Sequence, residues 1–137
     1  MKTILLFVLS VALALRSTAQ ERWTVVLNSK ALLAANTEDS VNNVVTLNDL
    51  KKGTLVVTYT PGKVQSGLSR RIAVYDAMDN ELYSKEALSI VIPVANLKKW
   101  QRDTLSPIKI YTWPVSKDPA IKLKVRRVHL CTINLAD

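Results

Sequence analysis

The segment RIAVYDAMDNELYS, residues 71–84, is the clearest secondary-structure signal in the chain. Two short runs with β-branched or aromatic residues, 71–76 and 81–84, flank a loop at 77–80. Asp79 and Asn80 in this loop tolerate turn geometry better than most residues do. The pattern therefore predicts a β-hairpin.

Outside this hairpin, apolar and polar residues alternate in short runs separated by turn residues, a pattern typical of β-strands. We expect further strands at residues 23–27, 31–35, 43–47, 54–60, 88–92, 107–112 and 121–130. A helix at residues 30–35 is the alternative for the second run, and Asn96 is expected to cap a single helical turn at 96–100. About nine short strands predict an all-β fold, an antiparallel two-sheet β-sandwich of immunoglobulin-like or related topology.

The last of these runs changes phase. Its apolar residues fall on odd positions in 121–125 and on even positions in 128–130. A single inserted residue moves every side chain that follows to the other face of a strand. We therefore expect a β-bulge near Arg126 and Arg127 that keeps both apolar sets on the core side.

Residues 1–19 have the features of a secretory signal peptide. A cationic start precedes an apolar run at 4–15, and Ser17 and Ala19 provide the small side chains of a cleavage site. The run is shorter than the roughly 18 to 20 residues that a spanning helix needs. We expect cleavage after Ala19, export to the periplasm or the extracellular space, and one domain at residues 20–137 without a transmembrane segment.

The net charge and the cysteine content limit the kinds of partner and of covalent cross-link that we expect. The chain carries 19 Lys and Arg residues against 11 Asp and Glu residues, a net charge of +8. This balance favours an acidic partner or surface as a long-range bias, and it also promotes solubility. Cys131 is the only cysteine, so no intramolecular disulfide can form and the domain depends on its apolar core.

His129 and Cys131 are the residues best suited to bind a transition metal. Residues two apart leave the same face of a regular strand, roughly 6 to 7 Å from each other. A blue-copper centre takes two histidines and one cysteine, whereas this chain has one histidine. We expect no bound metal or cofactor, with Cys131 as a small buried residue and His129 as a strand residue with a polar neighbour.

We expect no enzymatic activity. A Cys-His dyad needs hydrogen-bond contact and a third residue that orients the imidazole, and strand spacing keeps His129 and Cys131 too far apart. The carboxylates Asp76, Asp79 and Glu81 offer the pair that a glycosidase requires. Turn geometry explains their place in a hairpin loop equally well.

Aromatic and basic residues provide the candidate ligand-binding site, because exposed rings stack on sugars or bases while nearby cations meet anionic groups. Such residues gather at Lys98, Lys99, Trp100, Arg102, Tyr111 and Trp113. The alternative is that Tyr111 and one tryptophan are core residues. Strand alternation places Tyr111 on the face opposite Ile108 and Ile110.

A second basic group, Lys122, Lys124, Arg126 and Arg127, has a simpler interpretation. Lys122, Lys124 and Arg126 alternate with apolar residues on the predicted last strand, and lysines on an outer strand block edge-to-edge association. We therefore expect a solvated face.

These features favour an exported, non-catalytic β-sandwich domain that acts as a protein-interaction or structural accessory module. Its partner would be a protein or a cell-surface polymer. The alternative is a small module that binds carbohydrate or an anionic polymer at the aromatic and basic residues. We do not expect a nucleic-acid partner.

Overall fold

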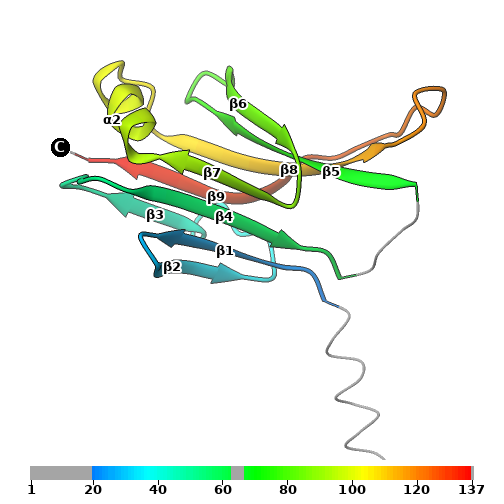
Figure 1. The fold of residues 1–137 in the computed structure, drawn as a ribbon, viewed down its shortest axis with the longest axis horizontal. Coiled ribbons are helices and arrows are strands. Elements are labelled where there is room, and N and C mark those ends of the chain that lie inside the picture. Colours follow the sequence, from blue (N-terminus) through cyan, green and yellow to red (C-terminus); the bar gives the residue numbers. More distant parts are fainter. Residues whose placement is uncertain (1–19, 63–66, 137) are drawn as a thin grey trace, which may run out of the picture.

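A computed structural model describes residues 20–62 and 67–136, and the expected signal peptide lies outside this part of the chain. The described residues form nine strands and one helix (Figure 1), which agrees with the number of strands predicted. The elements are β1 (Arg22–Leu27), β2 (Lys30–Ala35), β3 (Val44–Leu47), β4 (Thr54–Thr60), β5 (Leu68–Tyr75), β6 (Glu81–Glu86), β7 (Ser89–Pro93), α2 (Val94–Arg102), β8 (Ile108–Ser116) and β9 (Val128–Leu135).

The strands form a four-stranded sheet with the order β2-β1-β4-β7 and a five-stranded sheet with the order β3-β9-β8-β5-β6. The all-β class and the two sheets agree with the prediction. Purely antiparallel pairing does not, because β3 and β9 run parallel. The parallel pair extends the five-stranded sheet at its edge and lets Val45 and Leu47 of β3 join the buried core.

The hairpin predicted at residues 71–84 is confirmed as the antiparallel pair β5 and β6. Asp76 holds its loop, since one carboxylate oxygen accepts the backbone N–H groups of Met78 and Asn80, each at 2.9 Å. Asp79 has a φ of 63°, a left-handed conformation that Asp adopts more readily than most residues. The turn predicted from Asp79 and Asn80 therefore forms through a positive φ at Asp79 and side-chain hydrogen bonds of Asp76.

Residues 30–35 form the strand β2 and not the alternative helix. The turn before this strand contains Asn28 and Ser29, with φ values of 49° and 69°. Two successive residues with positive φ are characteristic of the tight turns that join antiparallel strands. The chain therefore returns along β1 as the outer strand of its sheet.

The helix α2 is longer than the predicted turn at residues 96–100. It follows Pro93 directly, and Asn96 lies inside the helix, so the predicted cap is wrong. The helix starts earlier because its buried face, which includes Leu97 and Trp100, begins with the first helical residue. No helix formed by the described residues is long and apolar enough to cross a membrane.

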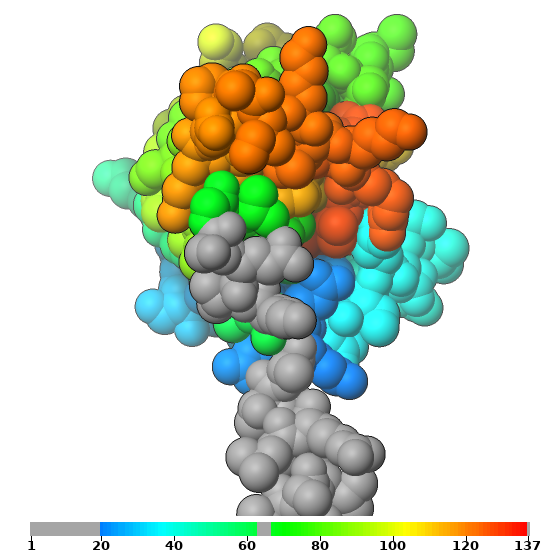
Figure 2. Space-filling model, turned by 90° about the vertical axis from the view of Figure 1, so that its right-hand side faces the viewer, coloured from blue at the N-terminus to red at the C-terminus, as the bar shows by residue number. Residues whose placement is uncertain are grey.

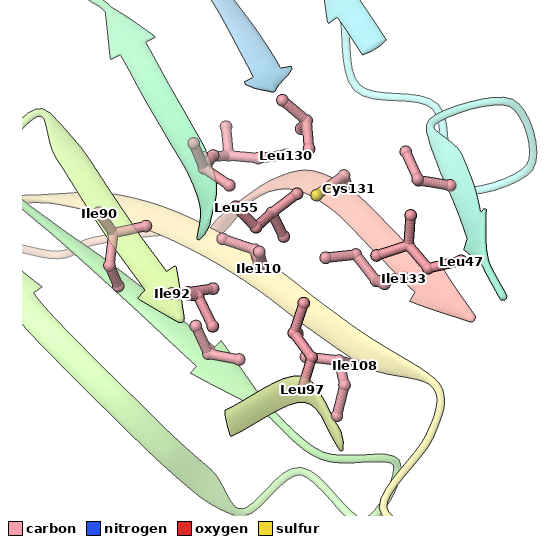
Figure 3. Close-up of a cluster of buried hydrophobic side chains, with 14 of the residues drawn as sticks. Leu47, Leu55, Ile90, Ile92, Leu97, Ile108, Ile110, Leu130, Cys131 and Ile133 are labelled. Carbon is pink, nitrogen blue, oxygen red and sulfur yellow. The ribbon is translucent and has the colours of Figure 1, made fainter. Parts of the chain in front are cut away.

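Both sheets and α2 contribute to one hydrophobic core (Figure 3). Leu55 and Ile92 of the four-stranded sheet, Ile110 and Ile133 of the five-stranded sheet, and Leu97 of α2 are at most 1% exposed. Burial of apolar surface contributes about 25 cal/mol per Å². This shared core is therefore the main force that holds the two sheets together.

Trp23 on β1 adds a polar link between the sheets. Its indole Nε1–H donates a buried hydrogen bond of 2.8 Å to the backbone carbonyl of Leu130 on β9. Trp23 is 1% exposed, so neither partner can exchange this bond for one with water. The bond therefore fixes where β1 crosses β9.

Leu130 is the extra residue of a β-bulge. Ile110 of β8 pairs with Cys131 of β9, and the next residue, Tyr111, pairs with His129. Leu130 lies between these two pairs and has no partner on β8. A bulge in the last strand was predicted correctly, but its predicted position was wrong. The backbone carbonyl of this bulge residue is the one that accepts the hydrogen bond from Trp23.

Residues 121–127, predicted as the first half of the last strand, are not part of a strand. The pairing of β8 with β9 ends at Thr112 and Val128, and beyond it Pro114 of β8 has no N–H with which to continue a ladder. Every residue of 121–127 is exposed, and Figure 2 shows the connection between β8 and β9, orange to orange-red, as a prominent part of the surface. We call residues 121–127 the basic segment.

The link between Trp23 and Leu130 leads to a stability prediction. Trp23→Phe should lower the free energy of unfolding by about 2 to 4 kcal/mol, because it removes ring volume and leaves the Leu130 carbonyl without its donor. Urea unfolding measures this loss. Trp113→Phe is the matched control, since Trp113 is only partly buried. Equal losses in the two variants would show that the buried hydrogen bond contributes nothing specific.

Candidate functional site

The structure divides the six predicted binding residues between two elements. Four of them, Lys98, Lys99, Trp100 and Arg102, lie on α2, whereas Tyr111 and Trp113 lie on β8. Trp100 is only 8% exposed and belongs to the core. Tyr111 and Trp113 alternate with the buried isoleucines of β8 and are partly exposed on the outer face of the five-stranded sheet. The predicted combination of three rings therefore does not form one surface.

Two of the α2 cations, Lys98 and Arg102, border an open hollow of about 300 Å³. Asp49, Leu50, Gln101 and Ala136 complete its described lining. The carboxylate of Asp49 reduces the positive potential there, and none of these lining residues is aromatic. The hollow therefore lacks the ring-plus-cation chemistry that the sequence suggested.

Tyr111 instead belongs to a cluster on the outer face of the five-stranded sheet. Its ring meets the rings of Tyr75 and His129 edge-on, each with a centroid distance of 5.6 Å. The guanidinium carbon of Arg127 lies 4.5 Å from the Tyr111 centroid and 4.9 Å from the Tyr75 centroid, within cation–π range. We call Tyr75, Tyr111, Arg127 and His129 the outer cluster.

Asp79 orients the guanidinium of Arg127. The Nη1 atom of Arg127 lies 3.1 Å from Oδ1 of Asp79, and this hydrogen bond is the main cause that raises the pKa of Arg127. Because the Asp79 side chain is 62% exposed, the ion pair alone stabilises the fold little. Its main effect is to keep the arginine over the two tyrosine rings.

Glu38, in the loop between β2 and β3, fixes the neighbouring arginine. Its carboxylate binds both terminal nitrogens of Arg126, with an Nη1–Oε1 distance of 3.0 Å, and accepts the backbone N–H of His129 at 2.8 Å. The hydrogen bond from Arg126 is the main cause that lowers the pKa of Glu38. Glu38 therefore holds the end of the basic segment against the start of β9.

The other end of the basic segment is held by Asp118. Its side-chain Oδ1 accepts the N–H of Ala120 at 3.0 Å, and its backbone carbonyl accepts the N–H of Ile121 at 3.1 Å. Between the two anchors, the apolar side chains remain in contact with water: Ile121 is 55% exposed, Leu123 38% and Val125 45%. The segment thus presents apolar and basic side chains without contributing to the core.

His129 and Cys131 lie on opposite faces of the five-stranded sheet, so the prediction of a shared face is wrong. The bulge at Leu130 reverses the alternation, which places His129 in the outer cluster and Cys131 in the core. Burial raises the pKa of the Cys131 thiol to about 12. With the sheet between them, the two side chains cannot bind one metal ion or form a catalytic dyad.

Two of the carboxylates considered for a glycosidase pair, those of Asp76 and Asp79, make structural contacts instead. Asp76 binds backbone groups of its turn and Asp79 binds Arg127. Among the described residues, no group of three or more His, Cys, Asp and Glu side chains could hold a metal ion. No protein family, curated protein or solved structure matches this chain. The functional interpretation therefore rests on the basic segment and the outer cluster.

The burial of Cys131 predicts that its thiol is inert in the folded protein. Because a raised pKa leaves almost no thiolate at pH 8, a disulfide reagent such as DTNB should not react until urea unfolds the chain. Release of thionitrobenzoate measures the reaction. Rapid stoichiometric labelling without urea would show that the thiol is accessible.

The burial of His129 predicts a pH-dependent loss of stability. Burial lowers the imidazole pKa below 6.5, Lys109 adds to this effect, and Glu38 opposes it. Below pH 6.5 the unfolded chain therefore binds a proton that the folded chain does not, so stability is lost as the pH falls from 6.5 through the folded pKa. Urea unfolding at pH 7.5 and 5.5 should show a smaller loss in His129→Gln than in the wild type. Equal losses would contradict the prediction, since the lowered pKa of Glu38 acts in a more acidic range.

Proposed function

We propose that this chain is an exported, non-catalytic interaction module that binds an acidic partner protein through its basic segment. The observation that carries the proposal is the exposure of Ile121, Leu123 and Val125, which alternate with basic residues. Grouped apolar side chains rimmed by polar ones are typical of interaction sites on proteins. A merely solvated loop has no need of three large apolar side chains in contact with water.

The anchors of the basic segment support this proposal. Glu38 and Asp79 neutralise Arg126 and Arg127, so these two arginines act as attachments to the domain. A segment that is ordered before binding loses less conformational entropy when a partner docks. The geometry therefore favours recognition over a purely solubilising role.

We further infer that the two sheets form a β-sandwich of immunoglobulin-like or related topology. The single core shared by a four-stranded and a five-stranded sheet supports this class. In sandwiches of this kind, loops at the ends of the strands commonly carry the binding residues. The basic segment is such a connection, between β8 and β9.

Binding of a carbohydrate or an anionic polymer is the second candidate function. Trp113 is partly exposed on β8 next to Arg71 of β5, which is a suitable place for one sugar ring or base. We rank this candidate lower because Trp23 and Trp100 are buried and Arg127 already lies over Tyr111. Of the three rings predicted to bind, this leaves Trp113, and one ring makes a weaker stacking platform than several.

Site-specific photo-crosslinking in the native host tests the proposal. Benzoylphenylalanine at position 123, in place of Leu123, should give one discrete adduct with a host protein. The same group at position 96, in place of the exposed Asn96 of α2, is the matched control and should give none. Lys122→Glu with Lys124→Glu should abolish the adduct at 123. Equal adducts at both positions, or none at 123, would contradict the proposed function.

A further inference from the structure

We propose that the basic segment binds by β-strand addition, in which an extended stretch of the partner pairs with the main chain of residues 122–126. The inference rests on the proposed function and specifies its mode. The partner stretch would alternate acidic with apolar residues. Main-chain hydrogen bonds would supply affinity, and the alternating side chains would supply specificity.

The backbone of the basic segment is available for such pairing. Within the described residues, no backbone–backbone hydrogen bond involves residues 122–126. Backbone N–H and C=O groups bind strongly wherever a partner strand can reach them. The composition also suits a strand, since isoleucine, leucine and valine alternate with lysine and arginine. The chain therefore supplies a strand-like sequence without a partner strand in the described structure.

Anchors at both ends prepare the segment for pairing. Asp118 binds the N–H of Ile121, while Glu38 binds Arg126 and the N–H of His129. The peptide groups of residues 122–126, which make no backbone–backbone hydrogen bond, thus lie between two fixed points. A partner strand would have to order few additional residues, which lowers the entropic cost of association.

The charges of the segment indicate the chemistry of the partner. Arg126 and Arg127 are paired with Glu38 and Asp79, whereas the described residues provide no ion pair for Lys122 or Lys124. Lysines at this spacing share one face of an extended segment, and the intervening apolar residues share the other. Opposite charges on neighbouring strands stabilise pairing, and like charges disfavour it. A stretch with acids facing the lysines fits, whereas a second copy of the basic segment would place lysines opposite lysines.

The outer strand β6 provides a useful comparison. It forms one edge of the five-stranded sheet and exposes Glu81, Lys85 and Glu86. Charges of both signs along an edge strand discourage pairing with another chain. The basic segment carries one sign of charge together with exposed apolar residues, so it favours a defined acidic partner.

A peptide-binding experiment on the full mature chain tests the mode of binding. The probe is a fluorescein-labelled peptide in which Glu or Asp alternates with Val or Ile, and the control peptide has Lys in place of every acid. Fluorescence anisotropy should detect binding of the acidic peptide only. Hydrogen exchange should slow at every second amide within residues 122–126 when that peptide binds, because alternate N–H groups face the added strand. Binding without slower exchange, or no binding of the acidic peptide, would overturn strand addition.

Proline substitutions test the main-chain contacts directly. Lys124→Pro and Val125→Pro each remove one N–H, and adjacent N–H groups of an extended chain point to opposite edges. One proline variant should therefore weaken peptide binding about tenfold relative to its matched control, Lys124→Gln or Val125→Ala. Circular dichroism should show all four variants folded, because both positions are exposed. If both prolines behave like their controls, strand addition is wrong, whereas a persistent crosslink at position 123 would leave the proposed function standing.

Discussion

The buried hydrogen bond from Trp23 to the carbonyl of Leu130 constrains the whole domain. It connects β1 of one sheet to the bulge in β9 of the other. Because a buried carbonyl without a donor is costly, the bulge and the indole must remain in register. The bulge in turn sends Cys131 into the core and His129 to the outer surface. The outer cluster therefore depends on an interaction made on the opposite side of the sheet.

The sequence predicted local structure well where neighbouring residues determine it. Residues 71–84 contain both strands and the loop that joins them, and Asp76 forms the turn with groups at most four residues away. The bulge required more information. Its phase change was visible in the sequence, but its position depends on Trp23, which lies 107 residues from Leu130. The alternation in 121–125 also predicted a strand, but these residues form none. A strand needs a neighbouring strand to pair with, and only the fold determines whether one lies beside it.

The same distinction explains the candidate site. Strand alternation correctly separated Tyr111 from the buried isoleucines of β8. It could not show that Trp100 would face the core, since that depends on how α2 packs. Glu38 was missed because 88 residues separate it from Arg126. Asp79 was considered as a turn residue, but its pairing with Arg127 was missed because 48 residues separate the two. In both cases an ordinary loop acid acquires its role only when the fold brings it to an arginine.

The two acid–arginine contacts also change the meaning of the basic segment. In the sequence, Lys122, Lys124 and Arg126 alternate with apolar residues, and together with Arg127 they suggest a solvated face. In the structure, Arg126 and Arg127 are committed to Glu38 and Asp79, so Lys122 and Lys124 carry the charge that remains near the exposed apolar side chains. Exposed ion pairs contribute little stability, so these contacts are better understood as positioning the segment than as stabilising the core. This positioning supports the proposed docking of a partner, because a segment that is already held in place loses less conformational entropy on binding.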